Sequence, residues 1–161
     1  MSVNRFQPHV LVLPEDDANS QLANGFWLFP SLLSRRMQVL PCAGGWHNVL
    51  ESFVADHADQ MRENTNRSIV LLIDLDGQEA RLTEVKAKIP VDLAERVFIL
   101  GALSEPEALR RDLRRSYETI GSEMAKDCRD ETKEVWGHAL LRHNATELER
   151  LRQHVRPILF A

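Results

Sequence analysis

The sequence predicts an α/β fold in which a mostly parallel sheet of about four strands is flanked by helices. Short apolar runs of β-forming residues recur along the first hundred residues, separated by segments with helical spacing of apolar residues. The run at 69–73 is apolar without interruption, as expected of a strand buried on both faces. From Ser104 onward the pattern is helical only. We therefore expect one domain over 1–161, with an α/β core over 1–103 and a helical extension over 104–161 packed on it.

The individual helices and strands are predicted from the periodicity of apolar residues and from the residues that start and end each segment. Four apolar segments predict strands, at 9–13, 37–40, 69–73 and 96–100. The segments with helical character predict helices at 16–33, 46–61, 79–88, 105–115, 118–129, 133–142 and 146–155. Asp16 or Asp17 can cap the first helix, since a carboxylate accepts from free amides of a first turn. Leu50, Phe53 and Val54 are predicted to form the inner face of the second helix.

Composition narrows the classes of function. The apolar fraction of 43% and the charged fraction of 27% are ordinary for a globular protein. No segment has the length of a membrane span, and the start of the chain lacks the apolar region of a signal peptide, so we expect a cytoplasmic protein without a membrane partner. Cys42 and Cys128 match no metal-binding spacing. A net charge of −4 means that nucleic-acid binding needs a local basic patch or metal bridging.

Two acidic residues follow the third predicted strand. Asp74 and Asp76 are two positions apart, so an extended chain directs both to the same side at the carboxyl end of the sheet. Adjacent carboxylates repel unless they share a proton or a cation, and Mg²⁺ (or Mn²⁺) suits a site of few carboxylates and several waters. The alternative is an Asp-Gly turn at Gly77 that only ends the strand.

Glu15 follows the first strand and is predicted to point into the same crevice. Gly44 and Gly45 follow the second strand in a turn that permits close approach of the backbone to a ligand or another element. Glu105 follows the fourth strand and is a further candidate metal ligand. The alternative is that Ser104 caps the next helix and Glu107 completes a capping box.

These residues, in this order, resemble a Toprim domain, the metal-binding catalytic module of topoisomerases, bacterial primases, ribosomal RNA maturases and overcome-lysogenization-defect nucleases. The resemblance covers roughly 10–100 and implies a Rossmann-like Toprim fold. It also implies that Glu15 acts in acid–base chemistry or binds metal, and that Asp74 and Asp76 bind Mg²⁺. Two positions depart from the family pattern: Asp16 replaces a glycine, and Gln78 replaces a third acid.

Two other families share part of the pattern. The acids after the first strand, with Asp74 as phospho-acceptor, resemble a response-regulator receiver domain, but no lysine follows the fourth strand where that fold needs one. The segment around Asp74 and Asp76 also resembles the nucleophile motif of haloacid-dehalogenase-type phosphatases. In that family a threonine normally follows the glycine and the motif opens the chain, whereas Gln78 follows here and the motif lies at the third strand.

A basic segment lies in the helical extension. Arg111, Arg114 and Arg115 are predicted to share a helix face, as either a solvated face or a strip that contacts phosphates. We therefore expect a Mg²⁺-dependent, Toprim-type nuclease acting on DNA or RNA. The alternative is a catalytically weak or inactive Toprim-fold module with a binding or regulatory function in a bacterial defence or toxin-type system. The sequence leaves open the protein partners and whether copies form a homo-oligomer.

Overall fold

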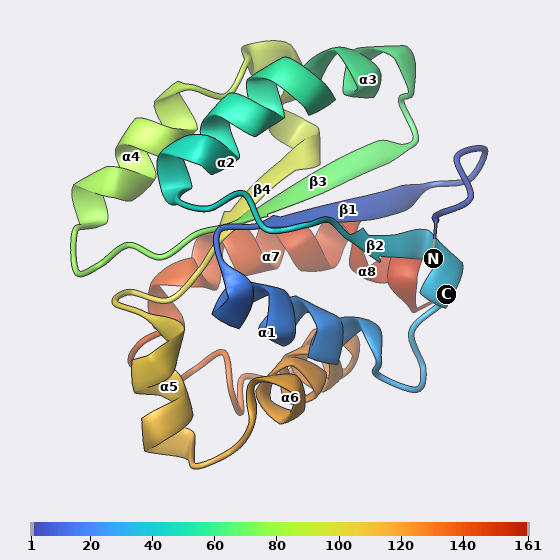
Figure 1. The fold of residues 1–161 in the computed structure, drawn as a ribbon. Coiled ribbons are helices and arrows are strands. Elements are labelled where there is room, and N and C mark those ends of the chain that lie inside the picture. The colour runs from blue at the N-terminus through green and yellow to red at the C-terminus, as the bar shows by residue number, and fades with distance from the viewer. Residues whose placement is uncertain (1, 161) are drawn as a thin grey trace.

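The computed structural model describes residues 2–160, and its centre is a four-stranded, all-parallel sheet between two layers of helices (Figure 1). The strands are β1 (His9–Pro14), β2 (Met37–Val39), β3 (Arg67–Leu72) and β4 (Val97–Leu100). Their spatial order is β2-β1-β3-β4. β1 and β3 pair over their full lengths, from His9 opposite Arg67 to Pro14 opposite Leu72. The predicted α/β class with a parallel sheet is confirmed.

Alternation along the strands builds two apolar cores. On β1, Val10 and Val12 belong to one core, and Leu11 and Leu13 belong to the other. The two neighbouring strands to one side, β3 and β4, alternate in the same way, because successive side chains of a strand point to opposite faces. Both faces of the central strands are therefore buried, as the uninterrupted apolar run at 69–73 predicts.

Each core has its own layer of helices (Figure 1). One layer comprises α2 (Trp46–Ser52), the π-helical turn η2 (Phe53–His57), α3 (Ala58–Glu63), α4 (Glu79–Ala87) and η3 (Val91–Arg96). The other comprises α1 (Asp17–Trp27), α5 (Pro106–Leu113), α6 (Tyr117–Asp130), α7 (Ala145–His154) and α8 (Arg156–Leu159), with the short turns η1 (Ser34–Arg36) and η4 (Arg142–Asn144) beside them. No helix within residues 2–160 combines the length and apolar composition of a membrane crossing.

Two helices differ from the prediction. α1 ends at Trp27, well before the predicted end, and Pro30 follows shortly; the ring of a proline disfavours helical backbone at the residue before it. In the second helix, the wider turn η2 changes the rotation of the residues around it. Val54, which lies within this turn, is exposed, whereas Val49 on the preceding α2 lies in the core.

The predicted helix over 133–142 is wrong. The segment forms a series of turns that is organised by the buried carboxylate of Asp127 at the end of α6. This carboxylate accepts hydrogen bonds from Thr132 Oγ1 and from the backbone amides of Glu134, Val135 and Trp136. Three amides that would otherwise need helical partners are thus satisfied by one side chain.

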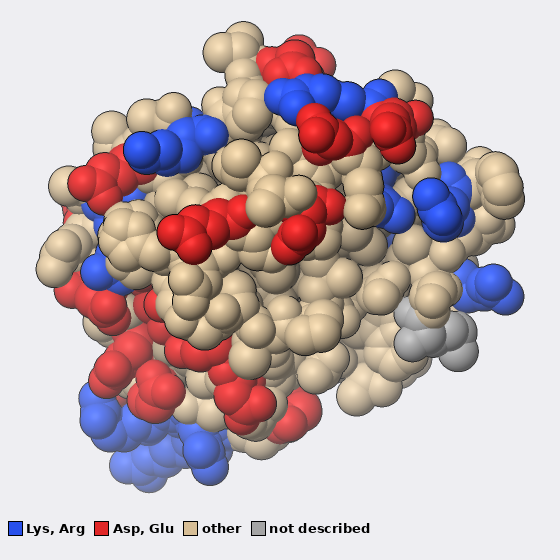
Figure 2. Space-filling model, turned by 45° about the horizontal axis from the view of Figure 1, so that its top comes forward, with Lys and Arg blue, Asp and Glu red and all other residues tan. Residues whose placement is uncertain are grey.

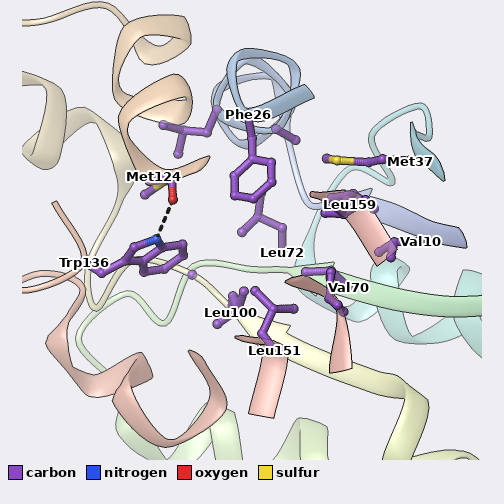
Figure 3. Close-up of a pocket in the computed structure, with 15 residues that line it drawn as sticks. Val10, Phe26, Met37, Val70, Leu72, Leu100, Met124, Trp136, Leu151 and Leu159 are labelled. Atoms are coloured by element: carbon purple, nitrogen blue, oxygen red, sulfur yellow. Dashed lines mark hydrogen bonds between the residues drawn. The ribbon is translucent and has the colours of Figure 1, made fainter. Parts of the chain in front are cut away.

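A small apolar cavity of about 70 Å³ lies between the sheet and the layer that contains α1 and α6 (Figure 3). Phe26, Met124 and Leu151 are among the side chains that line it. Trp136 also faces the cavity, and its indole Nε1 donates to the carbonyl oxygen of Met124 at 3.2 Å. The indole can lie in an apolar core because its single polar group has a partner.

The edge strand β4 is covered by polar side chains from the C-terminal helices. Glu147 Oε2 accepts from the backbone N–H of Ile99 at 3.0 Å. Asn144 Oδ1 accepts from the N–H of Gly101 at 3.3 Å, and its Nδ2 donates to the carbonyl of Gly101 at 3.0 Å. These bonds replace the neighbouring strand that an edge lacks, so they hold β4 in place and protect its backbone from pairing with another chain.

We expect the Asp127→Ala substitution to destabilise the protein by about 2–4 kcal/mol, because it leaves several buried backbone donors without an acceptor. Urea unfolding of the variant beside the parent would measure this loss. Asp130→Ala, at an exposed neighbouring acid, is the matched control and should change the free energy of unfolding by less than about 0.5 kcal/mol. Equal stabilities of the parent and Asp127→Ala would contradict the assignment of Asp127 as the organiser of the 133–142 segment.

Candidate functional site

The candidate site lies at the carboxyl ends of β1 and β3, in the middle of the sheet. The chain leaves β1 toward β2 on one side, and leaves β3 toward β4 on the other. The point between β1 and β3 is therefore the topological switch point of the sheet, where open parallel sheets bind ligands. Glu15 and Asp74 lie on the two sides of this point. Glu15 directly follows β1, and Asp74 lies two residues after the end of β3.

Glu15 is fixed by backbone hydrogen bonds on both sides. Its own N–H donates to the carbonyl of Leu72 at 2.9 Å, which continues the pairing of β1 with β3. Its side-chain Oε2 accepts from the N–H of Asp74 at 2.6 Å. Burial raises the pKa of Glu15, the bond from the Asp74 amide lowers it, and the charges of Asp16 and Asp76 raise it again. The carboxylate is thus held in a half-buried position next to other acids.

The glycine turn after β2 approaches the same residue. The N–H groups of Gly44 and Gly45 donate to the carbonyl of Glu15 at 2.8 and 3.2 Å. Both glycines have positive φ, of 84° and 125°, which other residues rarely adopt. The glycine turn therefore packs its backbone against the end of β1. Gly45 also directly precedes α2.

Asp74 is the most deeply buried acid of the site, with 5% of its surface exposed. Its Oδ1 accepts from Nδ2 of Asn19 on α1 at 3.1 Å. Burial has the largest effect on the pKa of Asp74 and raises it. The hydrogen bond from Asn19 lowers this pKa, and the charges of Glu15, Asp16 and Asp76 raise it further. The pKa of Asp74 is raised to about 8. A carboxyl of this kind is protonated at neutral pH unless a cation offsets its charge.

Asp76 is held from the opposite layer. β3 ends at Leu72, and Asp76 has a left-handed backbone with φ of 49°, so the extended geometry that directs alternate residues to one side does not reach it. Its Oδ2 accepts from Nη1 of Arg81 on α4 at 2.9 Å. Gly77 follows with φ of 73°, and its N–H donates to the carbonyl of Leu103 at 2.7 Å. Gly77 therefore completes a tight turn beside β4.

Two residues of the site have no obvious signal in the sequence. Asn19 is 1% exposed; its Nδ2 donates to both Asp16 and Asp74, and its Oδ1 has no hydrogen-bond partner. Arg81 is the cation nearest to the acids and lies over the ring of Trp46. The spacing of Asn19 from Asp16 suits a helix start, where the Asp16 carboxylate caps the Asn19 amide as predicted for Asp16. Only the tertiary structure shows that the same asparagine reaches Asp74.

Glu105 is not part of this arrangement. It is exposed at the start of α5 and is not among the charges that shift the pKa of Glu15 or Asp74. The capping alternative also differs from the structure, since α5 begins after Glu105 and the position before Pro106 makes no side-chain capping bond. Ser104 instead accepts, through its carbonyl, the N–H of Asp76 at 3.2 Å.

The arginines of the extension cluster around a surface concavity of about 560 Å³. Figure 2 shows blue side chains gathered at the lower left, in the region of α5, with acidic side chains beside them. α5 ends at Leu113 and Arg114 has a left-handed backbone, so Arg111, Arg114 and Arg115 do not share one helix face as predicted. They line the same concavity, together with Glu107, Arg110, Ser116 and Tyr117.

The donor set fits a hard divalent cation only in part. Within residues 2–160, no three acidic, histidine or cysteine side chains lie close enough to hold one ion together. The groups present are nonetheless all oxygen donors: the carboxylates of Glu15, Asp74 and Asp76, and the unpartnered amide oxygen of Asn19. One or two carboxylates with several waters is the coordination that Mg²⁺ commonly takes in proteins.

No family model, curated protein or solved structure matches this chain. The resemblance to Toprim domains therefore stays a prediction that rests on the residues of the crevice.

In metal-free buffer, Asp74 should make stability fall as pH rises. The pKa of Asp74 is raised in the folded state to about 8, from 3.8, so its contribution is fully present below about pH 4 and is lost as pH rises through 8. The slope can reach about 1.4 kcal/mol per pH unit. Unfolding of the parent and Asp74→Asn in urea with a chelator, from pH 4.5 to 8.5, isolates this contribution, because all other groups titrate in both. Parallel pH profiles of the two proteins would contradict it.

Proposed function

We propose that this chain binds Mg²⁺ or Mn²⁺ at Asp74 and Asp76 and, with Glu15 beside them as the proton-transfer group, cleaves phosphodiester bonds in nucleic acid. The observation that carries the proposal is the junction of Glu15 and Asp74 at the switch point of the sheet, where the Glu15 side chain accepts the Asp74 amide at 2.6 Å. Burial, reinforced by the charge of Glu15, disfavours the charged form of Asp74. A cation beside the two carboxyls would offset both effects, because an opposite charge favours the charged form.

Each residue has a distinct part in this proposal. Asp74 and Asp76 would hold the cation, with the Asn19 oxygen as a neighbouring donor. The bound ion would supply neutralisation of the phosphate charge and activation of a water molecule. Glu15 would transfer the proton of that water, since its raised pKa brings it nearer to the neutral range that suits a general base.

The arginine concavity supports nucleic acid as the substrate class. The protein has a net charge of −4, so attraction to phosphates must be local. Arg110 lies over the ring of Tyr117, at 5.1 Å from its centroid. The concavity lies on α5 and α6, and both helices pack against α1, which begins directly after Asp16. A strand of nucleic acid that contacts the concavity would reach the crevice along this layer.

A second candidate function is a binding or regulatory module with little or no catalysis. One observation favours it: Asp76 is already paired with Arg81, so a cation has to compete for this carboxylate. Both candidates predict binding of nucleic acid. They differ in whether a divalent cation supports cleavage.

We expect Mg²⁺ or Mn²⁺ to raise the melting temperature through preferential binding to the folded state. At a cation concentration one hundredfold above the Kd, the stabilisation is about 2.7 kcal/mol, or roughly 5–10 °C for a chain of this size. Differential scanning fluorimetry measures it, and the rise should grow with pH because Asp74 must lose its proton. In the Asp74→Asn, Asp76→Asn double variant the rise should be absent. An undiminished rise in that variant would place the cation elsewhere.

We expect Glu15→Gln to fold normally and to lose activity by about a hundredfold or more, as removal of a proton-transfer group typically does. The measurement is the initial rate of cleavage of labelled single- and double-stranded DNA and RNA with Mg²⁺ or Mn²⁺. Asp17→Asn, at an exposed acid in the first turn of α1, is the matched control and should keep the parent rate. Full activity of Glu15→Gln would remove Glu15 from the mechanism, and inactivity of the parent on every substrate would favour the binding module.

Replacement of Arg111, Arg114 and Arg115 by alanine should weaken nucleic-acid binding and reduce its salt dependence. Each lost phosphate contact lowers the slope of log K against log[salt] by about 0.9 on duplex DNA. Fluorescence anisotropy at several salt concentrations gives this slope. Removal of three exposed lysines elsewhere, Lys86, Lys88 and Lys133, changes the net charge equally and should leave the slope unchanged. Equal slopes for the parent and the arginine variant would assign these arginines to a solvated surface.

A further inference from the structure

Arg81 is the positive charge built into the acidic crevice. Its Nη1 donates to Asp76 Oδ2 at 2.9 Å and to the carbonyl oxygen of Asp74 at 2.8 Å. Only 10% of its side chain is exposed, whereas 55% of the Asp76 side chain is exposed. The arginine is thus the buried member of the pair, and the carboxylate that it holds remains open to solvent.

The rest of the Arg81 side chain is held by contacts that do not depend on Asp76. The guanidinium lies 4.9 Å from the ring centroid of Trp46, the first residue of α2, and the other aromatic neighbour of this indole is His47, at 3.8 Å between centroids. The Asp74 carbonyl is a second anchor. The Nε of Arg81 is buried and has no hydrogen-bond partner. The side chain can therefore release Asp76 and still keep a stacking partner and an acceptor.

The charges of the crevice require a counter-charge. Four carboxyl groups influence one another there, those of Glu15, Asp16, Asp74 and Asp76. The charge of Arg81 lowers the pKa of Glu15, whereas the charges of Asp16 and Asp76 raise it. Arg81 also donates hydrogen bonds to Asp74 and Asp76 directly. A divalent cation on Asp76 would lie within a few ångströms of the guanidinium, where two positive charges repel strongly.

We propose that Arg81 is an exchangeable counter-cation: it neutralises Asp76 in the metal-free protein and leaves this carboxylate when a divalent cation binds. The inference rests on the proposed function, because it concerns the same cation site. It makes Arg81 a positioning residue that sets how tightly the crevice takes its ion. The arginine keeps the acids together before the ion arrives, and it competes with the ion for Asp76.

The exchange has two consequences that are measurable without any catalytic assay. Removal of the competing charge should strengthen cation binding, so Arg81→Gln should bind Mn²⁺ about two- to fivefold more tightly than the parent, in line with the loss of one partly exposed ion pair. The guanidinium stays over the Trp46 ring but loses its Asp76 partner, and this change in the charge next to the ring should alter the fluorescence of that indole when Mg²⁺ binds.

The experiment is a Mn²⁺ titration of the full chain, with free Mn²⁺ measured by electron paramagnetic resonance. The parent, Arg81→Gln and Arg81→Lys are compared, with Arg62→Gln as the matched control, because Arg62 is also paired with aspartates, Asp59 and Asp92, but lies outside the crevice. We expect tighter binding for Arg81→Gln, and nearly parental binding for Arg81→Lys and Arg62→Gln. Circular dichroism and the melting temperature verify folding of each variant.

A Mg²⁺ titration of the parent, followed by tryptophan fluorescence, needs no change at Arg81. Trp46→Phe identifies the contribution of Trp46 against those of Trp27 and Trp136. A saturable Trp46 signal in the parent that is absent in Arg81→Gln supports the exchange. Equal or weaker Mn²⁺ binding by Arg81→Gln overturns the exchange and leaves the cation site standing. Absence of Mn²⁺ binding in both the parent and Arg81→Gln overturns the proposed function, and the exchange with it.

Discussion

The structure depends on the parallel pairing of β1 with β3 in the centre of the sheet. The register runs from His9 opposite Arg67 to Pro14 opposite Leu72. Because parallel strands end at the same edge, this register alone brings Glu15 beside Asp74. The backbone bond from Glu15 to Leu72 and the side-chain bond from Asp74 to Glu15 continue the pairing beyond the strands. The candidate site is thus an extension of the most buried hydrogen-bonded ladder of the protein, which makes its geometry stiff.

The C-terminal helices take part in the site through β4. Glu147 and Asn144 satisfy the outer edge of that strand, and the backbone beyond it then receives the loop that carries the acids. Leu75 N–H donates to the Ala102 carbonyl at 3.1 Å, and the Leu103 N–H donates to the Leu140 carbonyl at 2.8 Å. The helical extension is therefore connected to the acidic crevice by hydrogen bonds that run through the edge of the sheet, and it also carries the arginine concavity.

Two side chains, one from each helical layer, donate hydrogen bonds to the aspartates of the crevice. Asn19 reaches Asp74 from α1, and Arg81 reaches Asp76 from α4. Both carboxyls nevertheless keep raised pKa values, that of Asp74 about 8, because burial disfavours their charged forms and the neighbouring acids add to this effect. Perturbed acids of this kind cluster at functional sites.

The parallel sheet, its two buried faces and the edge at which Glu15 and Asp74 meet all follow from the amino-acid sequence. The periodicity of apolar residues is a local property, and parallel strands necessarily end at a common edge. The sequence by itself did not determine the 133–142 segment, since Asp127 outcompetes helical propensity only once α6 has placed it. Nor did it determine that Asn19 and Arg81 hold the two aspartates from opposite sides. Those contacts join residues far apart in the chain, and their distances depend on how each helix packs on the sheet, which no periodicity encodes.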